Sequence, residues 1–312
     1  MGDFRQKFFT FRPVQFENGE YLSTRSAWSF QRFRQSGLSE TRQVVDLKYK
    51  LGMRIVMRFL VIRACAIGDF VLNLPALRAL AKQYPGARFT LVGYPEVLSL
   101  AGPFLPVERI HSIESQPWCG LFSGYFRDLD FDAAWVWMKD PVVAENLRLS
   151  GVREVFHATP FPSTCHAAEH ILRTLQLPAP ELPDLWEAGS SRVLLHPGSG
   201  SRLKVWPHFD QLARSLPESV ILLGPRETPL DAPNACLKDL SLVEVAEEVR
   251  RCRLYIGNDS GITHIAAYWG APTIALFGPT DPSIWGPVGR RVKVLKGSSL
   301  RSISIEDVRK ML

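Results

Sequence analysis

Short apolar runs alternate with amphipathic stretches along the chain from residue 57 onward. Residues 75–85 have helical periodicity, and Pro75 lies in the first turn, where a missing N–H does no harm. Strands that alternate with helices predict parallel βαβ units and an α/β fold. The apolar runs predict buried strands at 59–64, 88–95, 109–113, 133–138 and 154–158.

The same alternation restarts after a Pro-rich segment at residues 178–191, which predicts a linker. A long helix is expected before it, at 163–177. Two capping-box spacings, Ser241 with Glu244 and Ser304 with Asp307, predict helix starts in the second half. The elements expected there are strands at 192–196, 219–225, 254–258 and 272–278, and helices at 209–217, 241–252 and 305–312.

The chain therefore predicts two doubly wound α/β domains in tandem, with their loops facing one another across a cleft. We expect the first domain at residues 55–180 and the second at 190–312. In open α/β sheets, ligands bind at the carboxyl ends of the strands, so the loops after these strands are the candidate sites.

Residues 1–54 are rich in Arg and aromatic side chains without a clean period. They predict a poorly ordered extension or an upstream start, with a membrane-surface arm as the alternative. This segment holds ten Lys and Arg against five Asp and Glu, which accounts for five of the six net positive charges. The remainder is near neutral, which argues against a nucleic-acid partner.

The composition is that of a soluble globular protein, with 46% hydrophobic and 22% charged residues. The five cysteines are odd in number and scattered, which favours reduced thiols and a cytoplasmic location. No apolar run reaches the ~18 residues of a membrane span, and the N-terminus lacks the apolar core of a secretory signal.

Asp69 follows the first predicted strand in "RACAIGDF" (63–70), where Gly68 permits a tight turn. It either caps the following helix or presents its carboxylate to a ligand.

The segment "HPGSGSRLKVWP" (196–207) can offer backbone N–H groups and hydroxyls to an anion, and Lys204 adds a positive charge. A flexible turn is the alternative there, but it does not explain the bulky Trp-Pro pair that closes the segment.

Glu227 lies just past another strand, where a carboxylate can accept the hydroxyls of a ribose. A solvated surface glutamate is equally compatible with the sequence.

In "IGNDSGITH" (256–264) a strand runs into a helix whose free N–H groups, with Ser260 and His264, suit a phosphate. Asp259 either caps that helix or contacts the hydroxyls of a sugar.

Two further motifs are better explained as ordinary structure. "HAAEH" (166–170) fits a zinc-binding pattern, but its helix is amphipathic and no third ligand is evident. "DLD" (128–130) resembles the metal-binding D-x-D of some sugar-nucleotide enzymes, but it lies in a polar turn before a strand. We therefore expect no metal site.

Together these loops resemble the bacterial heptosyltransferases of glycosyltransferase family 9, over about residues 57–312. The most specific stretch is "IGNDSGITHIAAYWGAPTIALFGPTDPSIWGP" (256–287), and "GDFVLNLPALRAL" (68–80) and the 196–207 segment match two other blocks. The resemblance implies a GT-B fold and inverting, metal-independent transfer of a heptose from ADP-heptose to the inner core of lipopolysaccharide. It implies no cofactor besides this nucleotide sugar, and a lipid-linked acceptor reached at the cytoplasmic face of the inner membrane.

The resemblance also implies roles for particular residues. Asp69 matches the general base, Lys204 the diphosphate-binding lysine and Glu227 the ribose-binding carboxylate. The expected donor-binding set is Ser199, Gly200, Ser201, Lys204, Glu227, Asp259, Ser260, Gly261 and His264. Cys65 departs from the family, which often has Ser there. A transferase for another nucleotide sugar and a catalytically silent nucleotide-sugar-binding protein remain as alternatives.

Overall fold

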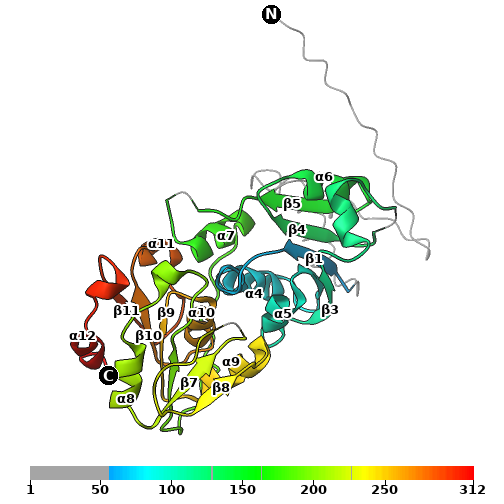
Figure 1. Ribbon diagram of the computed structural model, residues 1–312. Coiled ribbons are helices and arrows are strands. Elements are labelled where there is room, and N and C mark those ends of the chain that lie inside the picture. The colour runs from blue at the N-terminus through cyan, green and yellow to red at the C-terminus, as the bar shows by residue number, and fades with distance from the viewer. Residues whose placement is uncertain (1–55, 128, 163, 226) are drawn as a thin grey trace, which may run out of the picture. The chain divides into compact units, whose positions relative to one another are not determined.

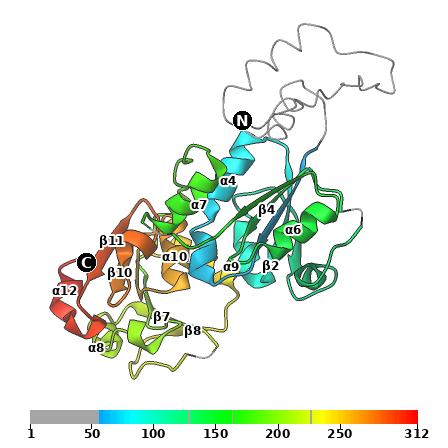
Figure 2. The same cartoon turned by 90° about the horizontal axis from the view of Figure 1, so that it is seen from above.

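A computed structural model describes residues 56–312, apart from residues 128, 163 and 226. Val56–Leu312 forms one compact unit, shown in two views in Figures 1 and 2. The expected N-terminal extension, residues 1–54, lies outside the described residues, as does Asp128 of the D-x-D motif. Within the described part of the chain, no helix combines the length and apolar character needed to cross a membrane.

The first sheet is parallel throughout, with the strand order β3-β2-β1-β4-β5. Its central strands are almost wholly buried, which explains their unbroken apolar runs: a parallel sheet covered on both faces has no solvated side. The strands are β1 (Arg58–Arg63), β2 (Arg88–Gly93), β3 (Val107–Ser112), β4 (Ala133–Trp137) and β5 (Glu154–Ala158).

Alternate side chains of β1 pack on opposite faces of this sheet. Leu60 and Ile62 belong to a core that includes Leu147 of α6, whereas Phe59 contacts the ring of Tyr84, just after α4, at 5.2 Å between centroids. Both faces are therefore covered, as in a doubly wound fold. The helices of this half are α3 (Ile67–Val71), α4 (Leu74–Gln83), α5 (Pro95–Leu98), α6 (Val142–Leu149) and α7 (Ala167–Leu175).

The second sheet is also parallel, with the strand order β11-β10-β9-β6-β7-β8. Counted from β6, this is the order 3-2-1-4-5-6 of a Rossmann sheet. The strands are β6 (Val193–His196), β7 (Ser219–Leu223), β8 (Cys236–Lys238), β9 (Leu254–Asn258), β10 (Thr273–Phe277) and β11 (Val292–Lys296).

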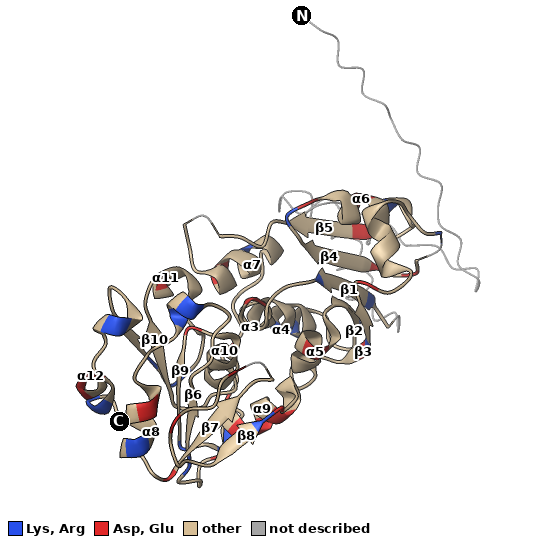
Figure 3. Cartoon of the chain, viewed as in Figure 1, with Lys and Arg blue, Asp and Glu red and all other residues tan. Residues whose placement is uncertain are grey.

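Five helices accompany the second sheet, within the described residues. Both capping boxes predicted from the sequence are confirmed, since Ser241 and Glu244 open α9 and Ser304 and Asp307 open α12. Acidic and basic residues are interspersed along the ribbon (Figure 3) and pair locally, as Arg251 does with Glu247 within α9. The helices are α8 (Phe209–Ser215), α9 (Leu242–Arg251), α10 (Gly261–Tyr268), α11 (Pro282–Trp285) and α12 (Ile305–Arg309).

Two sequence predictions need correction or refinement. The helix expected at 163–177 is shorter, because the ring of His166 accepts a hydrogen bond from the Ala168 N–H and caps α7, which ends before Gln176 in a left-handed conformation. The D-x-D motif was expected to lie in a polar turn before a strand. Its Asp130 is refined to a partner in a surface ion pair with Arg58, at 2.7 Å between the carboxylate oxygen and the guanidinium nitrogen.

The chain reverses its winding direction between β1 and β4 in the first sheet and between β6 and β9 in the second. Such switch points leave a crevice at the carboxyl ends of the strands. Close packing of α3, after β1, on α10, after β9, joins the two halves there. Residues 177–187 contain no helix or strand, and the domain boundaries at 55–180 and 190–312 stay a prediction.

Candidate active site

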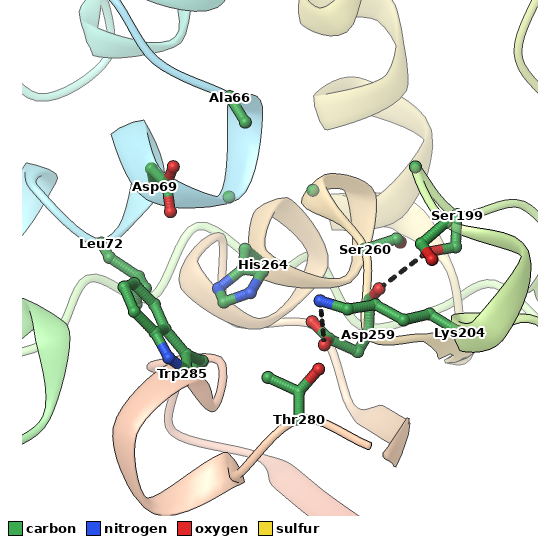
Figure 4. A pocket seen from close by; sticks show the side chains of 14 residues that line it. Ala66, Asp69, Leu72, Ser199, Lys204, Asp259, Ser260, His264, Thr280 and Trp285 are labelled. Carbon is green, nitrogen blue, oxygen red and sulfur yellow. Dashed lines mark hydrogen bonds and ion pairs between the residues drawn. The ribbon is translucent and has the colours of Figure 1, made fainter. Parts of the chain in front are cut away.

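Two adjoining cavities lie where the loops of the two sheets meet. The first, of about 430 Å³, is lined by nine of the ten residues predicted from the sequence (Figure 4). The second, of about 700 Å³, is lined by the tenth, Glu227. The cavities share Ser199, Gly200, Ser260 and Gly261, so they form one continuous site. The nine are Asp69, Ser199, Gly200, Ser201, Lys204, Asp259, Ser260, Gly261 and His264.

Asp69 enters the first cavity from α3. It does not cap that helix, whose N-cap is Ala66. Among the described residues, its carboxylate has no hydrogen-bond partner. Burial raises its pKa above the ordinary 3.8, and nearby Asp259 adds to this effect, while the positive charges of Arg63 and Lys204 oppose it. A carboxylate with a raised pKa and free oxygens can accept a proton from a bound hydroxyl.

The 196–207 segment is held against the second sheet by two buried side chains. Asn258 donates to the Pro197 carbonyl at 2.7 Å and accepts from the Trp206 N–H at 3.0 Å. The Trp206 indole, almost fully buried, donates to the Ile303 carbonyl at 2.9 Å. The segment is therefore fixed rather than a flexible turn, and its Gly200, Ser201 and Lys204 line the cavity.

Lys204 reaches across the first cavity to Asp259, with 2.7 Å between Nζ and Oδ2 (Figure 4). That Asp259 oxygen has no further hydrogen-bond partner within the described residues. The helix is capped by position 260, so Asp259 is not the cap. The pair puts a cation in the cavity with a buried carboxylate beside it.

The N-terminus of α10 faces both cavities. Ser260 is its N-cap, but its hydroxyl makes no capping bond, which leaves backbone N–H groups and the positive end of the helix dipole available to an anion. A Cβ on Gly261 would lie 2.5 Å from the Cβ of Ile67, and one on Gly68 would lie 2.9 Å from the ring of His264. Both glycines are therefore needed for α3 and α10 to approach.

His264 is buried on α10, and its Nδ1 has no hydrogen-bond partner among the described residues. Burial lowers its pKa to about 4, against the opposing effect of Asp259 and in the same direction as His166 and Lys204. The ring is therefore neutral at pH 7 and available for a hydrogen bond, but it adds no positive charge.

Glu227 is a half-buried residue of the second cavity rather than a solvated surface glutamate. Its carboxylate accepts from the Gly224 N–H at 2.9 Å and lies 3.3 Å from Nε2 of His196. Burial alone would raise its pKa, but the bonds to His196 and Gly224 outweigh it and lower the pKa. The side chain lies where a Cβ of Gly198 would stand, so only glycine fits there.

The rest of the second cavity is largely apolar and can accept a flat base beside the charged Glu227. This combination of an apolar slot and a carboxylate suits a nucleoside. Its apolar lining includes Leu222, Leu223, Leu240, Leu242, Val245 and Ile262.

Sequence reasoning missed His196, Thr280 and Trp285. Thr280 and Trp285 line the first cavity (Figure 4), and His196 lines the second. One signal existed for His196, because it is the only polar residue of β6 and stands at the carboxyl end beside the switch point. Thr280 and Trp285 lie after β10, within the stretch 256–287 that carries the family resemblance, and that resemblance was the signal that could have found them.

The zinc-like motif on α7 has other partners. Nε2 of His166 lies 2.9 Å from the Gly286 carbonyl, and that of His170 lies 2.8 Å from the Thr159 carbonyl. Within residues 56–312 as described, no group of three or more His, Cys, Asp and Glu is arranged to hold a metal ion.

The sequence matches known proteins over both halves. The family model of glycosyltransferase family 9 (heptosyltransferase) matches residues 167–310. Lipopolysaccharide heptosyltransferase 1 of Pseudomonas aeruginosa is 28% identical over 296 residues, a match that covers 75% of this chain and 82% of the relative. This second match is longer than the first and therefore extends outside residues 167–310.

Solved structures from Escherichia coli are similar to this fold. ADP-heptose lps heptosyltransferase II superposes with a TM-score of 0.67 at 19% identity, over 81% of this chain and 97% of that chain. Heptosyltransferase WaaC with ADP gives 0.65 at 19% identity, over 82% and 98%. The likeness confirms the predicted α/β architecture of two Rossmann-like domains, the GT-B fold.

Proposed function

We propose that this chain, whose residues 167–310 match the model of glycosyltransferase family 9, transfers a heptose, with inversion, from ADP-heptose to the inner core of lipopolysaccharide. The observation that carries this proposal is the pairing of the two cavities. One is suited to a nucleoside, and the other opens from it and holds a free carboxylate, Asp69, opposite a cation, Lys204.

The linings of the two cavities support one orientation of the donor in this proposal. Its adenosine occupies the apolar second cavity with the ribose hydroxyls at Glu227, and its diphosphate lies where the cavities meet, at the N-terminus of α10. Ser199, Gly200 and Ser201 line the same passage, with Lys204 beyond them. The heptose then lies in the first cavity, with Asp259 and neutral His264 available to its hydroxyls.

The first sheet supplies the base for this reaction. Asp69 removes the proton from the acceptor hydroxyl as that oxygen attacks the anomeric carbon from the face opposite the diphosphate. The new C–O bond forms as the bond between the anomeric carbon and the diphosphate oxygen breaks, so the configuration inverts. Negative charge grows on the departing ADP, where Lys204 and the α10 N–H groups stabilise it.

Each domain has a proposed task under this scheme. Residues 55–180 bind the acceptor and residues 190–312 bind the donor.

Since the implied acceptor is a lipid, we infer that the enzyme works in the cytoplasm in peripheral contact with the inner membrane. Sedimentation of the full chain and a chain lacking residues 1–54 with anionic vesicles tests this contact. Failure of both to sediment would contradict it.

Donor consumption by the purified full chain tests the proposed reaction. We expect ADP release from ADP-heptose only in the presence of an acceptor, with a lipid A–Kdo acceptor gaining the mass of one heptose. Parallel reactions with GDP- and UDP-sugars distinguish this donor from others. Transfer from one of those donors alone would refute ADP-heptose, and binding of every donor without turnover would refute an enzyme.

A further inference from the structure

His196 lines the second cavity and contacts Ser260, a residue that lines both cavities. It is the last residue of β6 and only 3% of it is exposed. Nε2 of its ring lies 3.3 Å from Oε1 of Glu227, and Nδ1 lies 3.3 Å from the hydroxyl oxygen of Ser260. One buried ring therefore contacts both a carboxylate at the nucleoside end and a hydroxyl at the anion end.

Counting protons fixes the roles of these atoms. A carboxylate only accepts hydrogen bonds, so Nε2 of His196 carries a proton. In a neutral ring Nδ1 is then an acceptor, and its partner Ser260 must donate to it. The hydroxyl of Thr263 already donates to the Asn258 carbonyl, and Tyr255 lies 3.1 Å from that same Thr263 oxygen. Among the described residues, Ser260 is therefore the hydroxyl that donates to Nδ1 of the neutral ring, and Oγ1 of Thr263, at 3.2 Å, is its other contact.

This arrangement does not suit a bound diphosphate. With the ring neutral, the single hydrogen of Ser260 points at His196, so the hydroxyl faces the cavity with lone pairs only. Phosphate oxygens are acceptors as well and form no bond to it. When the ring is protonated, Nδ1–H donates to Ser260, and the hydroxyl hydrogen is released from His196. Ser260 can then donate to a phosphate oxygen in the cavity, in competition with Oγ1 of Thr263 at 3.2 Å.

We propose that His196 takes up a proton when the nucleoside diphosphate of the donor binds, and that this proton turns Ser260 into a hydrogen-bond donor to the diphosphate. His196 is a positioning residue, because it acts through Ser260 and Glu227. The inference rests on the proposed function and adds a protonation step to donor binding.

The carboxylate of Glu227 is the charged group that lies against the His196 ring among the described residues. Glu227, whose pKa is lowered, faces it from the loop after β7. Tyr255 of β9 belongs to the same hydroxyl network, and burial keeps its phenol protonated, with a raised pKa. Glu96 of α5 lines the second cavity from the first sheet. Lys204, the cation of the first cavity, is already paired with Asp259.

Calorimetric titration of the full chain with ADP-heptose tests the proposal. The diphosphate of a nucleotide sugar is esterified at both ends and does not titrate near neutrality, whereas the terminal phosphate of ADP does. Heats measured in buffers of different ionisation enthalpy give the number of protons taken up. We expect an uptake of up to one proton near pH 7, and a Kd that rises by at most about tenfold per pH unit as pH increases.

Variants separate the proposed route from other sources of protons. His196→Gln and Ser260→Ala should each abolish proton uptake and flatten the pH dependence of Kd. Ser199→Ala is the matched control, because its hydroxyl also lines both cavities but bonds to the Asp259 carbonyl at 3.0 Å. It should keep the uptake even where its affinity falls.

The outcomes distinguish this inference from the proposed function. Binding of ADP-heptose by the unaltered chain without proton uptake overturns the inference and leaves the proposed function intact. Undiminished uptake in Ser260→Ala also overturns it. A chain that binds no ADP-heptose at any pH refutes both.

Discussion

Asp69 is the residue on which the proposed chemistry depends most directly. Its carboxylate lines the first cavity together with Lys204 and has no hydrogen-bond partner among the described residues. We expect Asp69→Asn to lower kcat by about 10²–10⁴-fold while the Kd for ADP-heptose stays unchanged, since a positioned base contributes that much and does not contact the nucleotide. Initial rates and calorimetry on the same preparation measure the two effects. Near-normal turnover would remove Asp69 from the role of base.

Burial of Asp69 also predicts a pH dependence. A base works when deprotonated, and its raised pKa means that the proton returns at a higher pH than on an exposed Asp. Activity should therefore be complete at neutral pH and fall as pH decreases, with the midpoint of the acid limb of kcat/KM above 3.8. The residual activity of Asp69→Asn should lack this limb. An identical acid limb in that variant would assign it to another group.

Lys204 and Asp259 are expected to be energetically coupled in ADP binding. Lys204→Met should raise the Kd for ADP by about 10–100-fold, the scale of one charged hydrogen bond, and it leaves the buried carboxylate of Asp259 unpaired near the diphosphate. Adding Asp259→Asn to that variant removes the repulsion and should restore part of the affinity. Calorimetry on the four proteins of the cycle measures the coupling, and additive effects would contradict it.

The residues of the site were predicted from their types and from their places after strands. Such reasoning found Asp69 and Lys204 because a charged residue after a buried strand is conspicuous. It did not foresee the ion pair of Asp259 or the contacts of His196, because partners distant in sequence depend on how two sheets meet. Asp259 was predicted either to cap a helix or to contact sugar hydroxyls, and only the structure excludes the cap.

At the scale of elements, the close approach of α3 and α10 holds Asp69, the proposed base, near the N-terminus of α10. Gly261→Ala places a methyl group 2.5 Å from the Cβ of Ile67, which forces the two helices apart. We expect a loss of about 1–3 kcal/mol in unfolding free energy and a lower kcat.

The matched control for this substitution is Gly124→Ala, whose new methyl group meets nothing within 4 Å. Denaturant unfolding and initial rates on both variants measure the difference. If Gly261→Ala matches the control in stability and turnover, the helices are not in tight contact.

The elements that the sequence predicted well are those with one environment along their length. β4 is buried at every position and reads as an apolar run, and the predicted caps at Ser241 and Ser304 depend only on local spacing. β8 and β11 were missed, because they are edge strands with mixed or exposed positions and no clean alternation. The start of α7 was misjudged, because the cap at His166 uses a ring nitrogen rather than a hydroxyl.

At the scale of the molecule, the proposal takes the base from the first sheet and the positive charge from the second. If Lys204 and the N–H groups of α10 stabilise the departing diphosphate as proposed, transfer should continue after exhaustive treatment with EDTA. Rates before treatment, after treatment and after added Mg²⁺ give the comparison. A loss of most activity that Mg²⁺ restores would show that a metal shares this task.

Both sheets could be predicted from the sequence because each repeats the same alternation around a Pro-rich linker. The way in which the two halves pack together could not be predicted, because it depends on contacts between side chains distant in sequence. One example is the ring of Phe104, whose centroid lies 5.2 Å from that of Tyr268 and 4.9 Å from that of Trp269. Such contacts leave no periodic trace in either segment.

The ion pair between Lys204 and Asp259 has a consequence for how the enzyme finishes a catalytic cycle. If Lys204 holds the diphosphate as proposed, we expect it to pair again with Asp259, whose Oδ2 lies 2.7 Å from its Nζ, when ADP dissociates. Such an intramolecular competitor should speed the release of ADP and weaken product inhibition. We infer that Asp259 promotes turnover after the chemical step, because it takes the place of the product phosphate at Lys204 and so frees the site for the next donor.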